Sequence, residues 1–188
     1  MNADPMMSDS GQQVFRALLH AMAEPGRARH LTGLPSGQGI ASGLAAVLHT
    51  LLDAECKVGL WHDVPEWRSW LREQLFVDIT GWQKAEFVLA RSDCWSWSAL
   101  TDLWPGSEEA PESSATLILE CGTEAEKTFL LSGPGIDGVR HCQLPLPAEF
   151  VPVWQHNASL YPRGMDVLLV MPAACIALPR TVRVQEVC

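Results

Sequence analysis

Apolar residues near the start of the chain recur at the spacing of an amphipathic helix. They fall at i, i+3, i+4 and i+7, which is the face that such a helix buries. These positions are Phe15, Leu18, Leu19 and Met22. Pro25 and Gly26 then stop the pattern, and Ser8 or Ser10 can cap the first free N–H groups. A helix that ends before Pro25 is therefore predicted.

The rest of the chain alternates between helical patterns and short apolar runs. Helical patterns are predicted at 40–53, from Pro65 onward, at 95–104 and at 148–159. Runs of strand length occupy 56–61, 85–90, 115–121, 127–131, 138–144, 165–171 and 175–179. Helices separate the strands in the first half, whereas strands follow one another in the second. We therefore expect a single α/β domain with a mixed β-sheet flanked by helices.

Composition agrees with one folded domain, and the net charge argues against some classes of binding partner. The chain has 188 residues, of which 47% are hydrophobic and 19% charged, as in a globular protein with a core. The domain is expected over residues 11–188, after a flexible N-terminus at 1–10. The formal net charge of −9 argues against nucleic acid or an anionic membrane as a partner. A local arginine cluster can still bind a small anion.

The cysteines and the first residues predict a location and a redox state. Six cysteines stand singly with no C-x-x-C pair, which is typical neither of a disulfide framework nor of a zinc site. The first residues show no export signal, and no apolar run approaches the roughly 20 residues that cross a bilayer. We expect a cytoplasmic protein with reduced thiols and no metal.

Residues 133–138 spell G-x-G-x-x-G, the letters of a dinucleotide-binding loop. Such a loop works only between a strand and a helix whose first N–H groups face the phosphates. Here alternating residues and then Pro145 and Pro147 follow Gly138, which indicates a strand and not a helix. The glycines are therefore predicted to form a tight turn between two strands, and no nicotinamide cofactor is expected.

Four arginines are candidates for holding an oxyanion. Arg27 and Arg29 lie in the loop after the first helix, where guanidinium groups can grip a phosphate or phosphonate bidentately. Arg163 in YPRGMD and Arg180 in LPRT are similar candidates. The alternative for each is a solvated loop arginine.

Two further sets of side chains have a functional and a structural interpretation. Cys121 after Glu120, or Cys142 beside His141, can be the nucleophile of a cysteine hydrolase, or a small buried hydrophobe. Tryptophans around the polar loop 105–114 can anchor a protein interface or fill the core. The three are Trp95, Trp97 and Trp104.

Seven segments, in order along the chain, resemble the H subunit family of the bacterial carbon–phosphorus lyase core complex. They are FRALLHAMAEPGR (15–27), LLDAEC (51–56), AEFVLA (85–90), PGSEEAPESSATLIL (105–119), LSGPGI (131–136), N-x(3)-YPRGMDVLLV (157–170) and ALPRT (177–181). The motif positions expected to carry structure are Pro25, Gly26, Gly133, Pro134, Gly135, Gly164, Asp166 and Pro179. The chain departs from the family at Glu24, where a basic residue is common, and at Arg163, where an aliphatic residue is common.

The resemblance implies a fold similar to the large domain of pyridoxal-phosphate-dependent transferases, without the cofactor. None of the three lysines, at 57, 84 and 127, lies in a motif that presents a Schiff-base amine. The resemblance also implies a subunit without catalytic residues of its own. Its complex would convert ATP and an alkylphosphonate to adenine and ribose 1-alkylphosphonate 5-triphosphate. The implied partners are a second copy of the chain and the G, I and J subunits.

Three alternatives to this role remain from the residues alone. They are a free-standing cysteine hydrolase, a nicotinamide-dependent oxidoreductase and a stand-alone anion-binding module. Each needs a feature that the structure can test: a nucleophile beside a base, a helix after the glycine stretch, or arginines that converge on one cavity.

Overall fold

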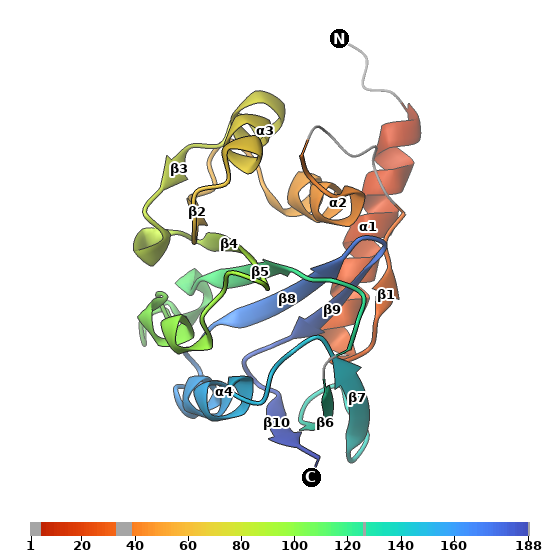
Figure 1. The fold of residues 1–188 in the computed structure, drawn as a ribbon, viewed down its shortest axis with the longest axis vertical. Helices are drawn as coiled ribbons and strands as arrows, with labels where there is room; N and C mark the ends of the chain where they lie inside the picture. The colour runs from red at the N-terminus through yellow and green to blue at the C-terminus, as the bar shows by residue number, and fades with distance from the viewer. Residues whose placement is uncertain (1–4, 33–38, 126, 188) are drawn as a thin grey trace.

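The computed structural model describes residues 5–32, 39–125 and 127–187. Within these residues the central sheet has seven strands, with helices on one face and a smaller sheet and α4 on the other (Figure 1). Its order is β1 (Arg29–His30), β9 (Ala174–Leu178), β8 (Asp166–Met171), β5 (Thr116–Glu120), β4 (Phe87–Arg91), β2 (Val58–Leu60) and β3 (Ile79–Thr80). Strands β8, β5, β4, β2 and β3 are parallel, and β9 is antiparallel to β8 and to β1. The predicted mixed α/β sheet is confirmed.

Helices α1 (Pro5–Ala23), α2 (Ser42–Leu51) and α3 (Pro65–Leu75) cover one face of this sheet. Pro65 occupies the first turn of α3, as predicted, where its missing N–H costs nothing. Helix α1 begins at Pro5, so the expectation that Ser8 or Ser10 caps its start was wrong. Residues 5–10, expected to be a flexible terminus, are therefore helical, and residues 1–4 lie outside the described residues.

The opposite face is covered by α4 (Phe150–Ser159), the 3-10 helix η2 (Trp97–Asp102) and a small antiparallel sheet. In the described chain this sheet has the order β10 (Arg183–Glu186), β6 (Lys127–Ser132) and β7 (Arg140–Leu144). Aromatic rings pack edge-on through this layer, with Trp97 4.7 Å from Phe150 between ring centres. Trp95 and Trp97 are each only 8% exposed and pack in the core, which is one of the two interpretations that the sequence left open for them.

The glycine stretch joins β6 to β7, as predicted. Leu131 pairs with Arg140 across the antiparallel hairpin, and no helix follows Gly138 before β7. Gly135 has a φ of +80°, and a Cβ there would overlap the carbonyl oxygen of Ala23 at the end of α1. A glycine is needed here because the turn lies against α1. Within the described residues, no helix is both long and apolar enough to cross a membrane.

Candidate functional site

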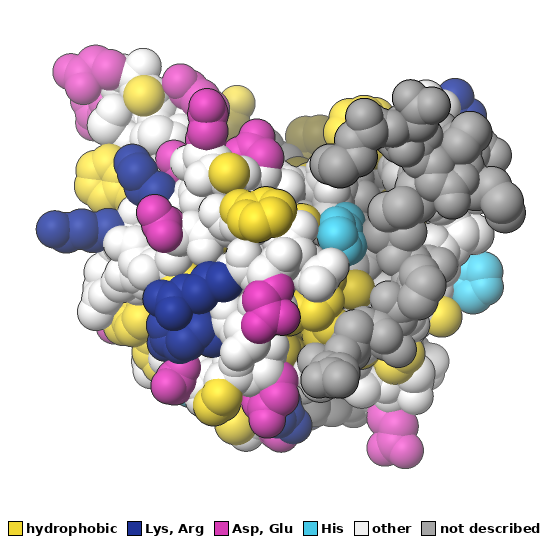
Figure 2. Space-filling view, turned by 90° about the horizontal axis from the view of Figure 1, so that it is seen from above, with side chains coloured by type: hydrophobic (Ala, Val, Ile, Leu, Met, Phe, Trp, Pro, Cys, Tyr) yellow, Lys and Arg dark blue, Asp and Glu magenta, His cyan; other side chains and the backbone are white. Residues whose placement is uncertain are grey.

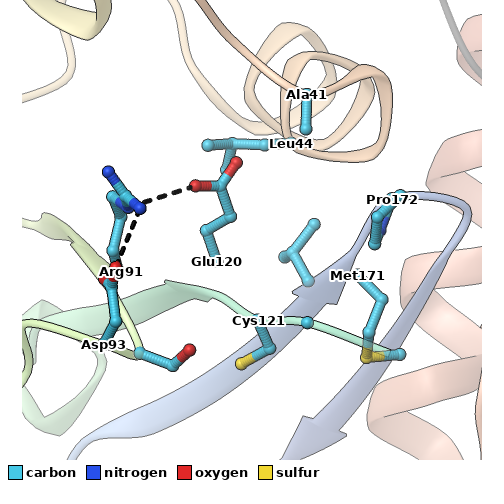
Figure 3. Close-up of a pocket in the computed structure, with 11 residues that line it drawn as sticks. Ala41, Leu44, Arg91, Asp93, Glu120, Cys121, Met171 and Pro172 are labelled. Atoms are coloured by element: carbon cyan, nitrogen blue, oxygen red, sulfur yellow. Dashed lines mark hydrogen bonds and ion pairs between the residues drawn. The ribbon is translucent and has the colours of Figure 1, made fainter. Parts of the chain in front are cut away.

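One hollow lies where the carboxyl ends of β4, β5 and β8 meet the start of α2. This edge of a parallel sheet is the usual place for a ligand in an α/β fold. The hollow has a volume of about 270 Å³. Its lining residues are Ala41, Leu44, Arg91, Ser92, Asp93, Glu120, Cys121, Gly122, Val170, Met171 and Pro172 (Figure 3).

Charges in this hollow are already arranged around one guanidinium group. Arg91 Nη2 lies 2.8 Å from Asp93 Oδ2, and Arg91 Nε lies 4.0 Å from Glu120 Oε2. Two carboxylates therefore face one cation, and these three groups carry a net charge of about −1 when all are ionised. Both carboxylates would repel a phosphate or phosphonate that approached the guanidinium of Arg91. The hollow in this state suits an anion poorly.

Glu120 is the group whose protonation this environment changes most clearly. Partial burial raises the pKa of its carboxyl, Arg91 opposes the shift, and Asp93 adds to it. A carboxyl of this kind can exchange a proton, but that alone is not a catalytic site. It needs a nucleophile or a substrate group on the same side of the sheet.

Cys121 does not supply that nucleophile. Its Sγ points to the opposite side of the β5 end from the Glu120 carboxylate (Figure 3). The side chain is buried with the residues under the sheet, and its thiol donates to the carbonyl oxygen of Leu119 at 3.4 Å. Glu120 and Cys121 therefore cannot act on one substrate from this arrangement.

Cys142 and His141 do not form a nucleophile–base pair either. They are neighbours in β7, where successive side chains point to opposite faces. Cys142 is buried and His141 is exposed. Burial also raises the pKa of the Cys142 thiol, which disfavours the reactive thiolate.

The four candidate arginines do not converge on one cavity. Arg27 and Arg29 both bind the carboxylate of Glu24, at 2.6 and 2.8 Å. Arg180 binds Asp166, the first residue of β8. Arg29 lies opposite Cys175 in the β1–β9 register, and Cys175 lies opposite Val170 near the end of β8. The two groups thus lie at opposite ends of the β8–β9 pair. Oxyanion binding by Arg27, Arg29, Arg163 or Arg180 stays a prediction.

The glycine and proline motifs meet at a junction between distant segments. Pro25 and Gly26 after α1 lie against the β6–β7 hairpin, where Arg140 Nη1 donates to the carbonyl oxygen of Pro25 at 2.5 Å. A Cβ at Gly26 would overlap Leu131, and the neighbouring Gly133–Pro134–Gly135 turn contacts the end of α1. The motifs near 25 and 133 therefore hold α1 to the small sheet.

The second motif junction joins the start of β8 to the segment after β9. Gly164 has a φ of +118°, and its N–H donates to Pro105 at 2.8 Å. Asp166 accepts from the backbone N–H of Arg180 at 2.8 Å, and the carbonyl of Pro179 accepts from Val182 at 2.9 Å. These contacts join the start of β8 to the loop 105–114 and to the segment after β9.

Sequence reasoning did not single out Arg91 and Asp93. Both follow a strand that was predicted, so their position after 85–90 was the available signal. In the described residues, no three His, Cys, Asp or Glu side chains gather to hold a metal ion, and a metal-free protein stays a prediction. In the described part of the face seen in Figure 2, Lys and Arg side chains alternate with Asp and Glu and form no continuous basic stripe.

Comparison with known proteins identifies the family. A family model described as "Bacterial phosphonate metabolism protein (PhnH)" matches residues 3–185. The chain belongs to the PhnH family. The chain is 28% identical, over 98% of its length and 94% of the relative's, to a protein of Rhizobium meliloti (strain 1021) named "Alpha-D-ribose 1-methylphosphonate 5-triphosphate synthase subunit PhnH".

A second relative supports the same assignment. It is the "Putative C-P lyase subunit protein HtxG" of Stutzerimonas stutzeri, 32% identical over 92% of this chain and 85% of the relative. The resemblance to the H subunit family, inferred from seven segments, is therefore confirmed. Both relatives are named as subunits, which indicates a subunit role in phosphonate catabolism for the PhnH family.

Proposed function

We propose that this chain is a non-autonomous subunit of a carbon–phosphorus lyase core complex. Its complex converts ATP and an alkylphosphonate to adenine and ribose 1-alkylphosphonate 5-triphosphate. The observation that carries the proposal is the family match across residues 3–185, together with relatives that are named as subunits. Because these matches span nearly the whole chain, the role does not depend on one short motif.

The chemistry of that reaction favours a non-catalytic role for this chain. The glycosidic C1′–N bond of ATP breaks, a phosphonate oxygen bonds to C1′, and adenine leaves with a proton on its nitrogen. A catalyst of this step holds several negative charges. The hollow at the carboxyl edge places two carboxylates around Arg91, an arrangement that disfavours further negative charge. The catalytic groups are thus proposed to belong to other subunits.

We further propose which subunits the chain binds, the compartment in which it acts and the known fold that it resembles. The partners are a second copy of the chain in isolation, and the G, I and J subunits in the complex. The location is the cytoplasm, and the fold is similar to the large domain of pyridoxal-phosphate-dependent transferases without their cofactor. The mixed sheet with helices on one face and α4 on the other is compatible with that similarity.

Co-purification tests the role directly. The tagged chain is co-expressed with G, I and J subunits and is expected to be recovered with them in fixed stoichiometry. The purified chain alone is expected to form a dimer by light scattering and to release no adenine from ATP. A chain that releases adenine unaided, or that never co-purifies with the other subunits, contradicts the proposal.

A further inference from the structure

Two exposed aromatic side chains lie on neighbouring loops at the amino-terminal edge of β5 and β8. Trp104 is 45% exposed and Tyr161 is 65% exposed. The loops are joined by the hydrogen bond from Gly164 N–H to the Pro105 carbonyl, and residues adjacent to both aromatics line one small cavity. Figure 1 shows α4, the helix that precedes the second of these loops, at this side of the sheet.

The protein holds Trp104 in place although nearly half of it is exposed. Its indole Nε1–H donates to Ser113 Oγ at 3.3 Å, and its carbonyl accepts from Ala115 N–H at 2.8 Å. Ser113 Oγ in turn donates to the carbonyl of Ala110 at 2.7 Å. A fixed aromatic side chain loses little conformational entropy on binding, which is typical of the residues that dominate interface energy.

The loop beside Trp104 is acidic and is tied to the body of the protein. Glu108, Glu109 and Glu112 are exposed on it. Arg180 Nη1 donates to the carbonyl of Pro111 at 2.8 Å, which fixes the loop to the segment after β9. This side of the protein therefore carries two exposed aromatic side chains and three exposed carboxylates. We call Trp104, Tyr161, Glu108, Glu109 and Glu112 the aromatic–acidic edge.

We propose that the aromatic–acidic edge docks a partner subunit whose surface offers an apolar pocket bordered by Lys and Arg. The inference rests on the proposed subunit role and assigns it a surface. Electrostatic complementarity favours such a partner, because exposed carboxylates attract a basic border and speed association. A second copy of the chain fits poorly, because a two-fold contact would place these carboxylates near their own copies in a chain with a net charge of −9.

The test uses three variants and two matched controls. Trp104→Ala and Tyr161→Ser remove one aromatic each, and the double variant Glu108→Lys with Glu109→Lys reverses the charge. Phe76→Ala removes an exposed aromatic after α3, and Glu73→Lys reverses an exposed charge on α3. Binding of each purified chain to the co-expressed G, I and J subunits is measured at about 50 mM and about 500 mM salt.

We expect each aromatic variant to weaken binding by about tenfold or more, as for central interface residues. The double charge reversal is expected to slow association at low salt and to reduce the salt dependence of binding. The controls are expected to stay within about twofold of the unchanged chain, as for surface positions outside an interface. Thermal melting shows whether Trp104→Ala still folds, and Tyr161→Ser tests the edge at a more exposed position.

The outcomes separate this inference from the proposed function. If the unchanged chain does not bind the other subunits, the subunit role fails. If it binds and all three variants bind equally well, the role stands and the aromatic–acidic edge is wrong. Variants that lose self-association but keep the other subunits would show that the edge contacts a second copy, which also overturns the inference.

Discussion

The guanidinium of Arg180 lies 2.6 Å from Oδ2 of Asp166, and the two side chains are 15% and 16% exposed. The same guanidinium donates through Nε to Asp166 Oδ1 at 3.2 Å, so the pair is bidentate. Through Nη1 it also reaches Pro111. One side chain thus connects β8, the segment after β9 and the loop 105–114. Oxyanion binding by Arg180 stays a prediction, and its guanidinium is already paired with Asp166 in this structure.

Replacing Arg180 by alanine is expected to lower the free energy of unfolding by about 3 kcal/mol, because Asp166 is left largely buried without an opposite charge and keeps only its bond from the backbone N–H of residue 180. Arg27→Ala is the matched control. Arg27 is also paired with a carboxylate but is 58% exposed, and exposed pairs contribute about 0–1 kcal/mol. Urea unfolding of both variants measures the difference. An equal loss in both would contradict the structural role of Arg180.

Gly135 and Gly138 lie in the same turn but differ in their surroundings. Both have positive φ, +80° and +66°, yet only at Gly135 would a Cβ meet the end of α1. Gly138→Ala is therefore expected to cost about 1 kcal/mol for the backbone conformation alone. Gly135→Ala is expected to cost roughly 2 kcal/mol or more, because steric overlap is added.

Thermal and urea unfolding of the two glycine variants measure this difference. The same preparations are titrated with NAD and NADP, which are expected to leave the tryptophan fluorescence and the melting temperature of the unchanged chain unaltered. Micromolar binding that Gly135→Ala abolishes would return the stretch to a dinucleotide-binding interpretation.

Asn157 is a buried polar residue whose side-chain amide makes two hydrogen bonds to the backbone of Met165. Its Nδ2 donates to the Met165 carbonyl at 2.9 Å, and its Oδ1 accepts from Met165 N–H at 2.8 Å. Asn157→Ala leaves both backbone groups unpaired and is expected to cost about 2 to 3 kcal/mol. Asn157→Asp keeps the acceptor but turns the donor into a carboxylate facing a carbonyl, and is expected to destabilise as well. Full stability of the aspartate variant would contradict this pairing.

The elements that the sequence predicted well are those whose burial follows from local pattern. Residues 85–90 became β4, and the helix opened by Pro65 became α3. Strands β1 and β3 were missed, because two residues carry no periodicity and their register is imposed by neighbouring strands. The strands of the small sheet were mostly predicted, but their separation from the central sheet was not, since pairing is decided in space.

The candidate site was harder to predict for the same physical reason. Arg91 and Asp93 follow β4 and Glu120 ends β5, but only the order of the parallel strands brings them to one edge. For Trp97 the difficulty is that its residue type does not distinguish an interface from a core. An indole fits an interface or a core equally well, and here Phe150 of α4 completes its packing. Such a contact between distant segments leaves no local signal.

Glu120 gives the hollow at the carboxyl edge a testable dependence on pH. Partial burial raises the pKa of its carboxyl, so the folded state holds the proton more strongly than the unfolded chain. Stability from this group is present below the unfolded pKa of about 4.5 and is lost as the pH rises through the folded value. Glu120→Gln removes the titration and keeps the shape.

The melting temperature of Glu120→Gln, minus that of the unchanged chain, is therefore expected to increase as the pH rises from about 4 toward 7. Arg91 acts against this trend, because its attraction at 4.0 Å favours the charged carboxylate, but burial is the larger effect. Glu73→Gln on α3 is the matched control, because it makes the same substitution at an exposed glutamate outside the hollow. A Glu120→Gln difference that shrinks with rising pH would mean that Arg91 outweighs burial, and that the guanidinium is bound to Glu120 more tightly than the 4.0 Å separation implies.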